Sequence, residues 1–347
     1  MLPVVWFWIV AVMIAMYVVL DGFDLGAGII HLAVAKTDEE RRMVLKSIGP
    51  VWDGNEVWLL AGGGTLYFAF PVLYASSFSG FYLPLMVVLW LLILRGTSVE
   101  FRSHIQNTVW RPMWDVIFGF SSALLAIFFG AALGNVVRGV PLNEKGEFFL
   151  PLWTNFQPGR EPGILDWYTI LIGVYAFLVL TQHGALWVAY KTPSPVQERA
   201  RNIARPVWYA VAALTVVVTV ASFRLQPKLA ESFVRWPAGY VFPLLALVSL
   251  AGILVFQRKQ DDLKAFLSSM FFIVGMLTSV VFGVFPMVLP ANTDPAFSLT
   301  IYNASAPEYG LKVGLWWFTP GILIAAFYFW FLYRRFAGKV TVEQEGY

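Results

Sequence analysis

The chain has 347 residues, of which 59% are hydrophobic and 13% charged, and its mean hydropathy is +0.68. A water-soluble domain could not bury that much apolar surface, so the composition predicts a polytopic membrane protein. The absence of cysteine excludes disulfides, iron–sulfur clusters and thiolate-bound haem, and three histidines are too few for a haem–copper centre. We attribute the net charge of +3 to loop charges that orient the protein.

Nine apolar runs are long enough to cross about 30 Å of hydrocarbon as helices. They lie at Pro3 to Val34, Val51 to Phe70, Ser76 to Leu94, Met113 to Val137, Ile164 to Tyr190, Val207 to Phe223, Trp236 to Phe256, Leu263 to Leu289 and Leu311 to Tyr333. We expect an all-α fold and one integral membrane domain over residues 1–347. A boundary between two helical bundles is expected near residues 138–163.

The loops between these runs differ in charge. Of the 24 lysines and arginines, 17 fall on the side that holds the loops after the first, third, fifth and seventh runs and the C-terminus. Because positively charged loops stay in the cytoplasm, this bias predicts an N-terminus outside and a C-terminus in the cytoplasm.

The first two runs each contain a pair of acids three residues apart, Asp21 with Asp24 and Asp53 with Glu56. An ionisable residue inside a spanning helix costs roughly 2.5 to 3.5 kcal/mol on insertion scales, so it is usually retained for a task. The spacing of three places both acids of a pair on one helix face.

Two interpretations stay open for Asp53 and Glu56. A buried carboxyl can take up and release protons, which favours a proton relay. Alternatively, an acid close to a helix start accepts backbone N–H groups and stabilises the helix end. For Asp21 and Asp24 we favour a structural role, in which they bond a neighbouring helix or pair with Arg95.

Further charged residues lie at the cytoplasmic ends of the third and fourth runs, namely Arg95, Glu100, Arg102 and Asp115. With the predicted orientation, acids of four consecutive runs are expected at a similar depth, where cytoplasmic protons would enter. His183 could approach a haem, although a histidine bonded within the bundle is the commoner case. His31 and His104 lie near the ends of runs, and no nucleic-acid-binding pattern is present.

Six sequence blocks carry a resemblance to a known family. They are Asp21-Gly-Phe-Asp-Leu-Gly, Gly49-Pro-Val-Trp-Asp-Gly-Asn-Glu-Val-Trp58, Phe78-Ser-Gly-Phe-Tyr82, Trp110-Arg-Pro-Met-Trp-Asp115, Gly134-Asn-Val-Val-Arg-Gly-Val-Pro141, and Phe285-Pro-Met-Val-Leu-Pro290 with Ser298-Leu-Thr-Ile-Tyr-Asn-Ala-Ser305. In this order they resemble subunit II of the cytochrome bd family of quinol oxidases.

The resemblance implies nine transmembrane helices, arranged as two four-helix bundles plus one peripheral helix. It implies a heterodimer with a larger subunit I that holds two b-type haems, a d-type haem or a third b-type haem, and the quinol site. This chain would then ligate no haem. A structural quinone in the chain, a small single-span accessory subunit and surrounding lipid are further expected partners, in a bacterial or archaeal cytoplasmic membrane.

The resemblance also assigns roles to residues. Proton-pathway positions of the family match Asp53 and Glu100, and we add Glu56, although some members have Gln there and Asp in place of Glu100. Supporting roles fall to Asp21, Asp24, Arg95 and Asp115, and to Trp52 and Asn55 beside Asp53. Within this resemblance, His183 could point to the cyanide-insensitive branch.

The sequence therefore predicts a subunit of a quinol:dioxygen oxidoreductase that scaffolds subunit I and supplies a cytoplasmic proton-uptake route. The alternative is a proton- or cation-coupled secondary transporter that uses the intramembrane carboxylates. A third interpretation is that the chain is a purely structural subunit without a proton role. The transporter is disfavoured because no pair of similarly interrupted segments occurs in the two halves of the chain.

Overall fold

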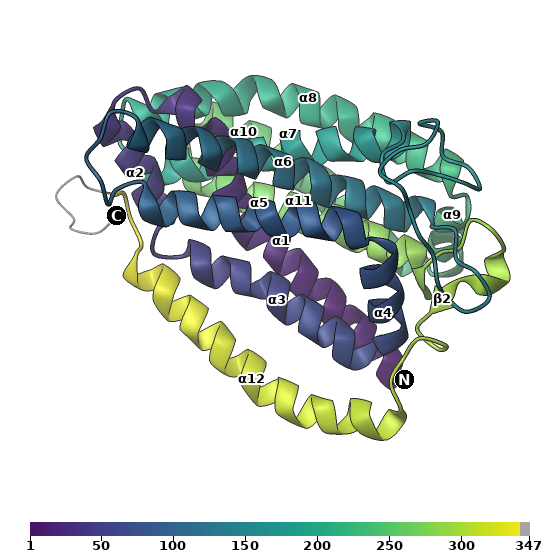
Figure 1. Cartoon of the computed structure of the whole chain (residues 1–347). Helices are drawn as coiled ribbons and strands as arrows, with labels where there is room; N and C mark the ends of the chain where they lie inside the picture. Colours follow the sequence, from purple (N-terminus) through teal and green to yellow (C-terminus); the bar gives the residue numbers. More distant parts are fainter. Residues whose placement is uncertain (341–347) are drawn as a thin grey trace.

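The apolar runs form long helices that lie side by side and alternate in direction (Figure 1). The structure, a computed structural model, describes residues 1–340, so the last seven residues of the expected domain lie outside it. The elements are α1 Leu2–Val34, α2 Asp38–Ile48, α3 Trp52–Ala69, α4 Pro71–Gly80, α5 Tyr82–Phe101, α6 Trp110–Arg138, α7 Trp167–Lys191, α8 Val196–Leu225, α9 Lys228–Arg235, η1 Pro237–Tyr240, α10 Val241–Arg258, α11 Asp262–Val284, β1 Met287–Leu289, η2 Pro295–Phe297, β2 Leu299–Thr300 and α12 Glu308–Arg335.

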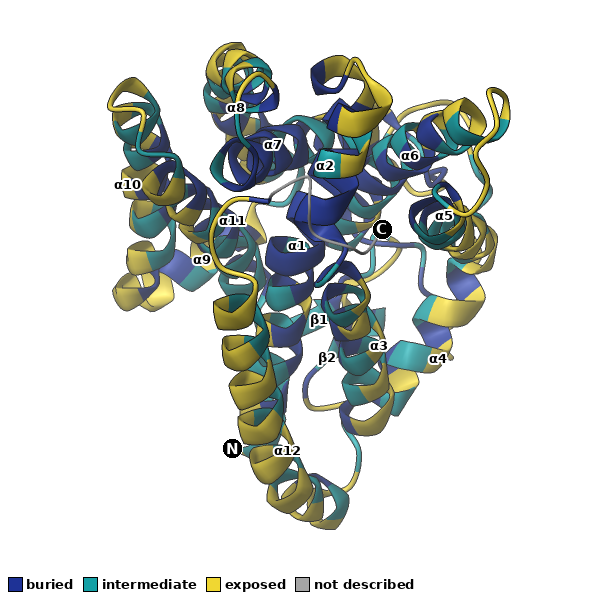
Figure 2. Cartoon of the chain, turned by 90° about the vertical axis from the view of Figure 1, so that its left-hand side faces the viewer, coloured by how far each residue is buried: buried dark blue, intermediate teal, exposed yellow. Residues whose placement is uncertain are grey.

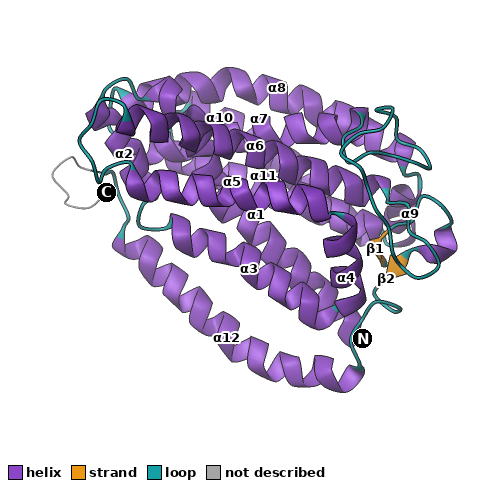
Figure 3. Ribbon diagram, in the orientation of Figure 1, coloured by secondary structure: helices purple, strands orange, loops and turns teal. Residues whose placement is uncertain are grey.

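The all-α prediction is confirmed, and Figure 3 shows helix throughout apart from one short hairpin and the loops. Among the described residues, eight helices are long and apolar enough to cross a membrane. The ninth expected span corresponds to α3, whose 18 residues reach about 27 Å. Two acids and three consecutive glycines lower the hydropathy of α3.

The third expected run, Ser76 to Leu94, is wrong in its bounds. Pro71 begins the separate helix α4, which suits a residue without an N–H at a first helical position, and α5 begins only at Tyr82. The α5 helix then continues past Arg95, because this side chain is paired inside the bundle and does not need water. Similarly, α8 begins at Val196, since its first polar turns bond other helix ends.

Eight of the long helices form two groups of four, and the long helix α12 lies outside them. The first group is α1, α3, α5 and α6, and the second is α7, α8, α10 and α11, with both α1 and α6 also packed on α7. Figure 2 shows the buried residues in α1 and α7 and mostly exposed residues along α12. Leu311 is the buried residue of α12, which makes this helix peripheral.

The contact between α1 and α7 depends on two glycines. A Cβ on Gly26 would lie 2.0 Å from the carbonyl oxygen of Leu180, and a Cβ on Gly184 would lie 2.2 Å from the carbonyl carbon of Gly26. Such distances are impossible, so the two backbones touch only because both positions lack a side chain. This contact joins the two groups at the centre of the molecule.

The bundle has two distinct ends. At one, α2 and the start of α8 are joined by Arg199 and Glu40 at 2.7 Å, and the start of α8 binds α11 through Arg201 and Asp262 at 2.6 Å. The loops expected on the cytoplasmic side gather there, and we call it the α2 end. The hairpin end carries the N-terminus, α9 and the β1–β2 pair, in which Met287 faces Thr300 (Figure 1).

Candidate functional site

A fully buried ion pair joins α1 to α5. The Arg95 guanidinium donates to both oxygens of Asp21, one of them at 2.9 Å, and both side chains are 0% exposed. Glu56 of α3 lies 3.7 Å from the same guanidinium, and its side chain is 23% exposed. A buried charge is tolerated only with such pairing, so the three helices are held together by one arginine.

The second acid of α1 is linked to α12 through an amide. Asn55 donates to Asp24 at 2.8 Å and to the carbonyl of Leu20 at 3.2 Å, while the Tyr333 hydroxyl donates to Asn55 at 2.8 Å. Asp24 Oδ1 is buried without a hydrogen-bond partner among the described residues. We call Asp21, Asp24, Asn55, Glu56, Arg95 and Tyr333 the core cluster.

Local sequence explains why these residues meet. Asp21 and Asp24 lie one turn apart on α1, and Asn55 and Glu56 are adjacent in α3, so each helix presents two polar groups to its neighbour. Trp52 is 9% exposed, and its ring lies against Gly96, where a Cβ would be 3.5 Å from it. Trp52 therefore packs α3 on α5.

Asp53 and Glu100 lie outside the core cluster. Asp53 is exposed, Glu100 is half-buried, and neither has a hydrogen bond or ion pair within residues 1–340. Asp53 is two residues from Asn55, so the two side chains point to different sides of α3. The acids that the sequence analysis expects at one depth are thus divided between buried, paired groups and unpaired groups on the outside.

Asp115 belongs to a second cluster at the α2 end. Its carboxylate accepts hydrogen bonds from His31 at 2.7 Å, Arg41 at 3.0 Å and Arg102 at 2.6 Å. Arg102 also bonds Asp38 at 2.7 Å, and Arg111 bonds the other oxygen of Asp38. We call Asp38, His31, Arg41, Arg102, Arg111 and Asp115 the edge cluster. It ties α1, α2, α5 and α6 together.

A third buried ion pair, which the sequence did not predict, lies near the hairpin end. Arg138 donates to Asp166 and, at 2.6 Å, to the Asn135 oxygen. Asp166 also caps α7 through the backbone N–H groups of Tyr168 and Thr169. The capping pattern from Asp166 to Thr169 is a signal that could have located it.

The three histidines lie in different surroundings. Both ring nitrogens of His183 are bonded, Nδ1 to the Ser269 hydroxyl at 2.7 Å and Nε2 to the Val19 carbonyl at 2.9 Å. His31 Nε2 is bonded to Asp115, while its Nδ1 has no partner among the described residues, and His104 is exposed in a turn. Among the described residues no group of three His, Asp or Glu side chains could hold a metal ion.

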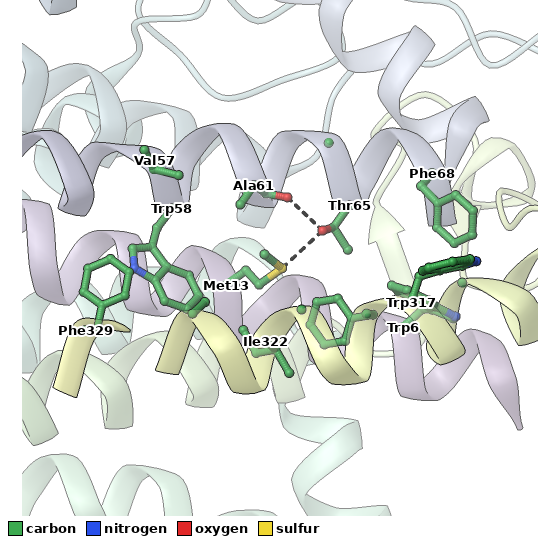
Figure 4. Close-up of a pocket in the computed structure, with 15 residues that line it drawn as sticks. Trp6, Met13, Val57, Trp58, Ala61, Thr65, Phe68, Trp317, Ile322 and Phe329 are labelled. Atoms are coloured by element: carbon green, nitrogen blue, oxygen red, sulfur yellow. Dashed lines mark hydrogen bonds between the residues drawn. The ribbon is translucent and has the colours of Figure 1, made fainter. Parts of the chain in front are cut away.

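An apolar groove of about 530 Å³ lies between α3 and α12, with α1 at its base (Figure 4). Its lining is aromatic and aliphatic, as the labelled Trp58, Phe68 and Phe329 show. The hydroxyl of Thr65 lies 2.7 Å from the Ala61 carbonyl and 3.2 Å from the Met13 sulfur, so its single hydrogen is used within the protein. The groove suits a long apolar chain.

The chain is similar to proteins of known description. A family model described as cytochrome bd terminal oxidase subunit II matches residues 2–336. The "Cytochrome bd-I ubiquinol oxidase subunit 2" of Escherichia coli K12 is 29% identical, over 98% of this chain and 95% of the relative. The "Cytochrome bd ubiquinol oxidase subunit 2" of Bacillus subtilis 168 is 32% identical, over 89% of this chain and 88% of the relative.

The fold has a counterpart among solved structures. A chain of the bd oxidase from Geobacillus thermodenitrificans superposes with a TM-score of 0.75 over 96% of this chain and 98% of its own length. Its sequence identity is 18%, so this likeness concerns the arrangement of the helices.

Proposed function

This chain belongs to the cytochrome bd terminal oxidase subunit II family and is a membrane-spanning subunit of a respiratory quinol oxidase, and we propose two roles for it. It scaffolds a haem-bearing subunit I, and it supplies protons for oxygen reduction. The α2 end takes the cytoplasmic side in this proposal, in keeping with its excess of lysine and arginine. The secondary transporter is not favoured, since the family match covers residues 2–336.

The observation that carries the proposal is an unpaired acid at the end of an outward apolar stripe. Asp53, Val57 and Leu60 share one face of α3, where Val57 also borders the apolar groove, and Val57 and Leu60 are 50% and 72% exposed. Lipid would be a costly neighbour for the carboxylate. A partner subunit on this face would cover the apolar residues and could supply Asp53 with polar neighbours.

A second acid ends a similar stripe on the adjacent helix α5. Trp90, Ile93 and Glu100 lie on one face, and the first two are 64% and 44% exposed. Asp53 and Glu100 lie toward the α2 end of their helices, the end that this proposal places on the cytoplasmic side. Each carboxylate could accept a proton from water and pass it on to the partner.

The core cluster has a supporting part in this proposal. An amide separates Asp24 from Tyr333, and an amide does not relay protons as a carboxyl or water does. Its bonds instead hold α1, α3, α5 and α12 in register, which sets the position of Asp53. Glu56, the partly exposed acid of the core cluster, is a candidate third carboxyl of the route.

Replacing Asp53 by Asn tests the proton role. Asp53 is exposed and unpaired, so we expect Asp53→Asn to assemble with full haem content while turnover falls about tenfold to a hundredfold. Proton uptake by the complex in proteoliposomes should fall in parallel, and Asp53→Glu should restore most of it. A haem-loaded Asp53→Asn complex with unchanged turnover would refute the proton role of Asp53 and favour the interpretation of the chain as a purely structural subunit.

The haems of the complex are expected in the partner, as membership of the family implies, and both ring nitrogens of His183 are occupied.

We assign the structural quinone to the groove of Figure 4, where an isoprenoid tail would meet apolar side chains. Ala325→Trp fills this groove and should reduce the quinone extracted with the purified complex. Ala326→Trp, outside the lining, is the control, and equal loss in both variants would refute the assignment.

A further inference from the structure

A second pocket, of about 340 Å³, opens at the α2 end between α7, α11 and the segment that follows α12. Four cationic side chains line it, namely Lys46, Lys191, Arg335 and Lys339, and we call it the basic pocket. Among the described residues no aspartate or glutamate lines it. The charged side chains that the structure describes in its walls are therefore all cationic.

Lys191 shows that the basic pocket is built into the fold. This side chain is 6% exposed, its Nζ donates to the Phe336 carbonyl at 2.5 Å, and it lies 5.6 Å from the centre of the Trp187 ring. Val340 in turn donates to the Lys191 carbonyl at 2.8 Å, so the segment after α12 closes over the end of α7. Lysines at helix ends usually extend into water, whereas this one is turned inward.

One wall of the pocket is apolar and continues along a helix. Leu263, Leu267 and Met270 lie on one face of α11, and the first two are 42% and 39% exposed. Since α11 runs from the α2 end toward the hairpin end, this face leads from the basic pocket into the depth of the membrane. The ligand that fits both parts has an anionic head and apolar chains.

We propose that the basic pocket binds the phosphate of an anionic phospholipid whose acyl chains lie along Leu263, Leu267 and Met270. Basic pockets between membrane helices are suited to such headgroups, and lipid is the anionic amphiphile that surrounds the protein. Tyr333 also lines the pocket and is bonded to Asn55 of the core cluster. The lipid would thus fasten the end of the peripheral helix α12 to the bundle, independently of any proton role.

The test measures the lipid retained by the purified oxidase complex. Native mass spectrometry would compare phosphatidylglycerol with phosphatidylcholine, added to the delipidated complex, for the wild type and for the Arg335→Gln, Lys339→Gln double variant. Both positions are exposed, so folding should survive. We expect phosphatidylglycerol binding to fall roughly fivefold for each cation removed, and phosphatidylcholine to bind weakly throughout.

The control removes two charges at the same end without touching the pocket. Arg258 and Lys259 are exposed and do not line it, so Arg258→Gln with Lys259→Gln should keep the wild-type affinity. Lys191→Gln tests the buried cation and should lower the affinity at least as much as one exposed charge. Equal losses in pocket and control variants, equal binding of both lipids, or displacement by millimolar inorganic phosphate would overturn the proposal.

Discussion

The core cluster and the edge cluster both hold buried carboxyl groups between helices, but they pair these groups differently. In the edge cluster, Asp115 receives three side-chain donors from His31, Arg41 and Arg102, which occupy both of its oxygens. In the core cluster, Asp24 receives one amide donor and keeps an oxygen without a partner within residues 1–340. Both residues are buried, Asp24 with 0% and Asp115 with 1% of its surface exposed.

The difference separates acids that fix the positions of helices from acids that have an oxygen free to take up a proton or bind water. A carboxylate surrounded by cations is held charged and fixes the helices that supply the donors. A buried carboxyl with an open oxygen has room for a proton or a water molecule. The core cluster also depends on a single arginine, whereas the edge cluster shares its charge among three, so the two should respond unequally to the loss of one partner.

The largest effect is expected from Arg95→Leu. It leaves Asp21 buried without its cation, which costs roughly 3 to 5 kcal/mol, so the complex should melt at a lower temperature and lose haem. The thermal midpoint of the purified complex measures this. Adding Asp21→Asn to Arg95→Leu should recover part of the loss, and a single variant with the wild-type midpoint would contradict the pairing.

Asp115→Asn should cost less, roughly 1.5 to 3 kcal/mol, the range for hydrogen bonds to charged groups. Arg102 keeps its bond to Asp38, and Arg41, with 25% of its side chain exposed, can turn to water. The same midpoint measurement applies. If Asp115→Asn were more damaging than Arg95→Leu, the proposed difference between the clusters would be wrong.

Tyr333→Phe should have a smaller effect, about 0.5 to 1.5 kcal/mol, because it removes one hydrogen bond between α12 and Asn55. Hydrogen exchange along α12 should become faster near Tyr333, while α1 and α5 keep their protection. Tyr328→Phe is the matched control, since Tyr328 lies on the same helix and is 52% exposed. Equal exchange in both variants would mean that the bond does not hold α12.

The smallest effect concerns Glu40 in α2. Burial favours a higher pKa for this carboxyl, but the N–H groups of Lys36 and Thr37 and the Arg199 guanidinium lower its pKa below the usual 4.5. A lowered folded-state pKa contributes stability above pH 4.5 that is lost as the pH falls further. Glu40→Gln should remove this acid dependence and cost about 1 kcal/mol near neutral pH.

An acid titration of the thermal midpoint measures this effect. The wild type and Glu40→Gln should converge below pH 4.5. Glu39→Gln, at the exposed neighbouring position, should follow the wild type throughout. A constant difference between Glu40→Gln and the wild type at every pH would show that the ionisation of Glu40 is unimportant.

Much of the fold could be predicted from the sequence because the membrane imposes it. A spanning helix needs a long apolar run, and such runs are visible whatever surrounds them. The order of the motifs also identified the family that the comparisons show. The break at Pro71 and the extension of α5 past Arg95 were missed, because both depend on what the neighbouring helices offer.

The sequence by itself determined that Asp21, Asp24, Asp53 and Glu56 lie in two helices with a shared spacing. Only the tertiary structure decided which of them face the bundle, since a helix has the same periodicity whichever side its neighbours occupy. The partners come from far along the chain: Tyr333 is 278 residues from Asn55, and Asp115 is 84 residues from His31. No local pattern encodes such pairs, because the packing of whole helices creates them.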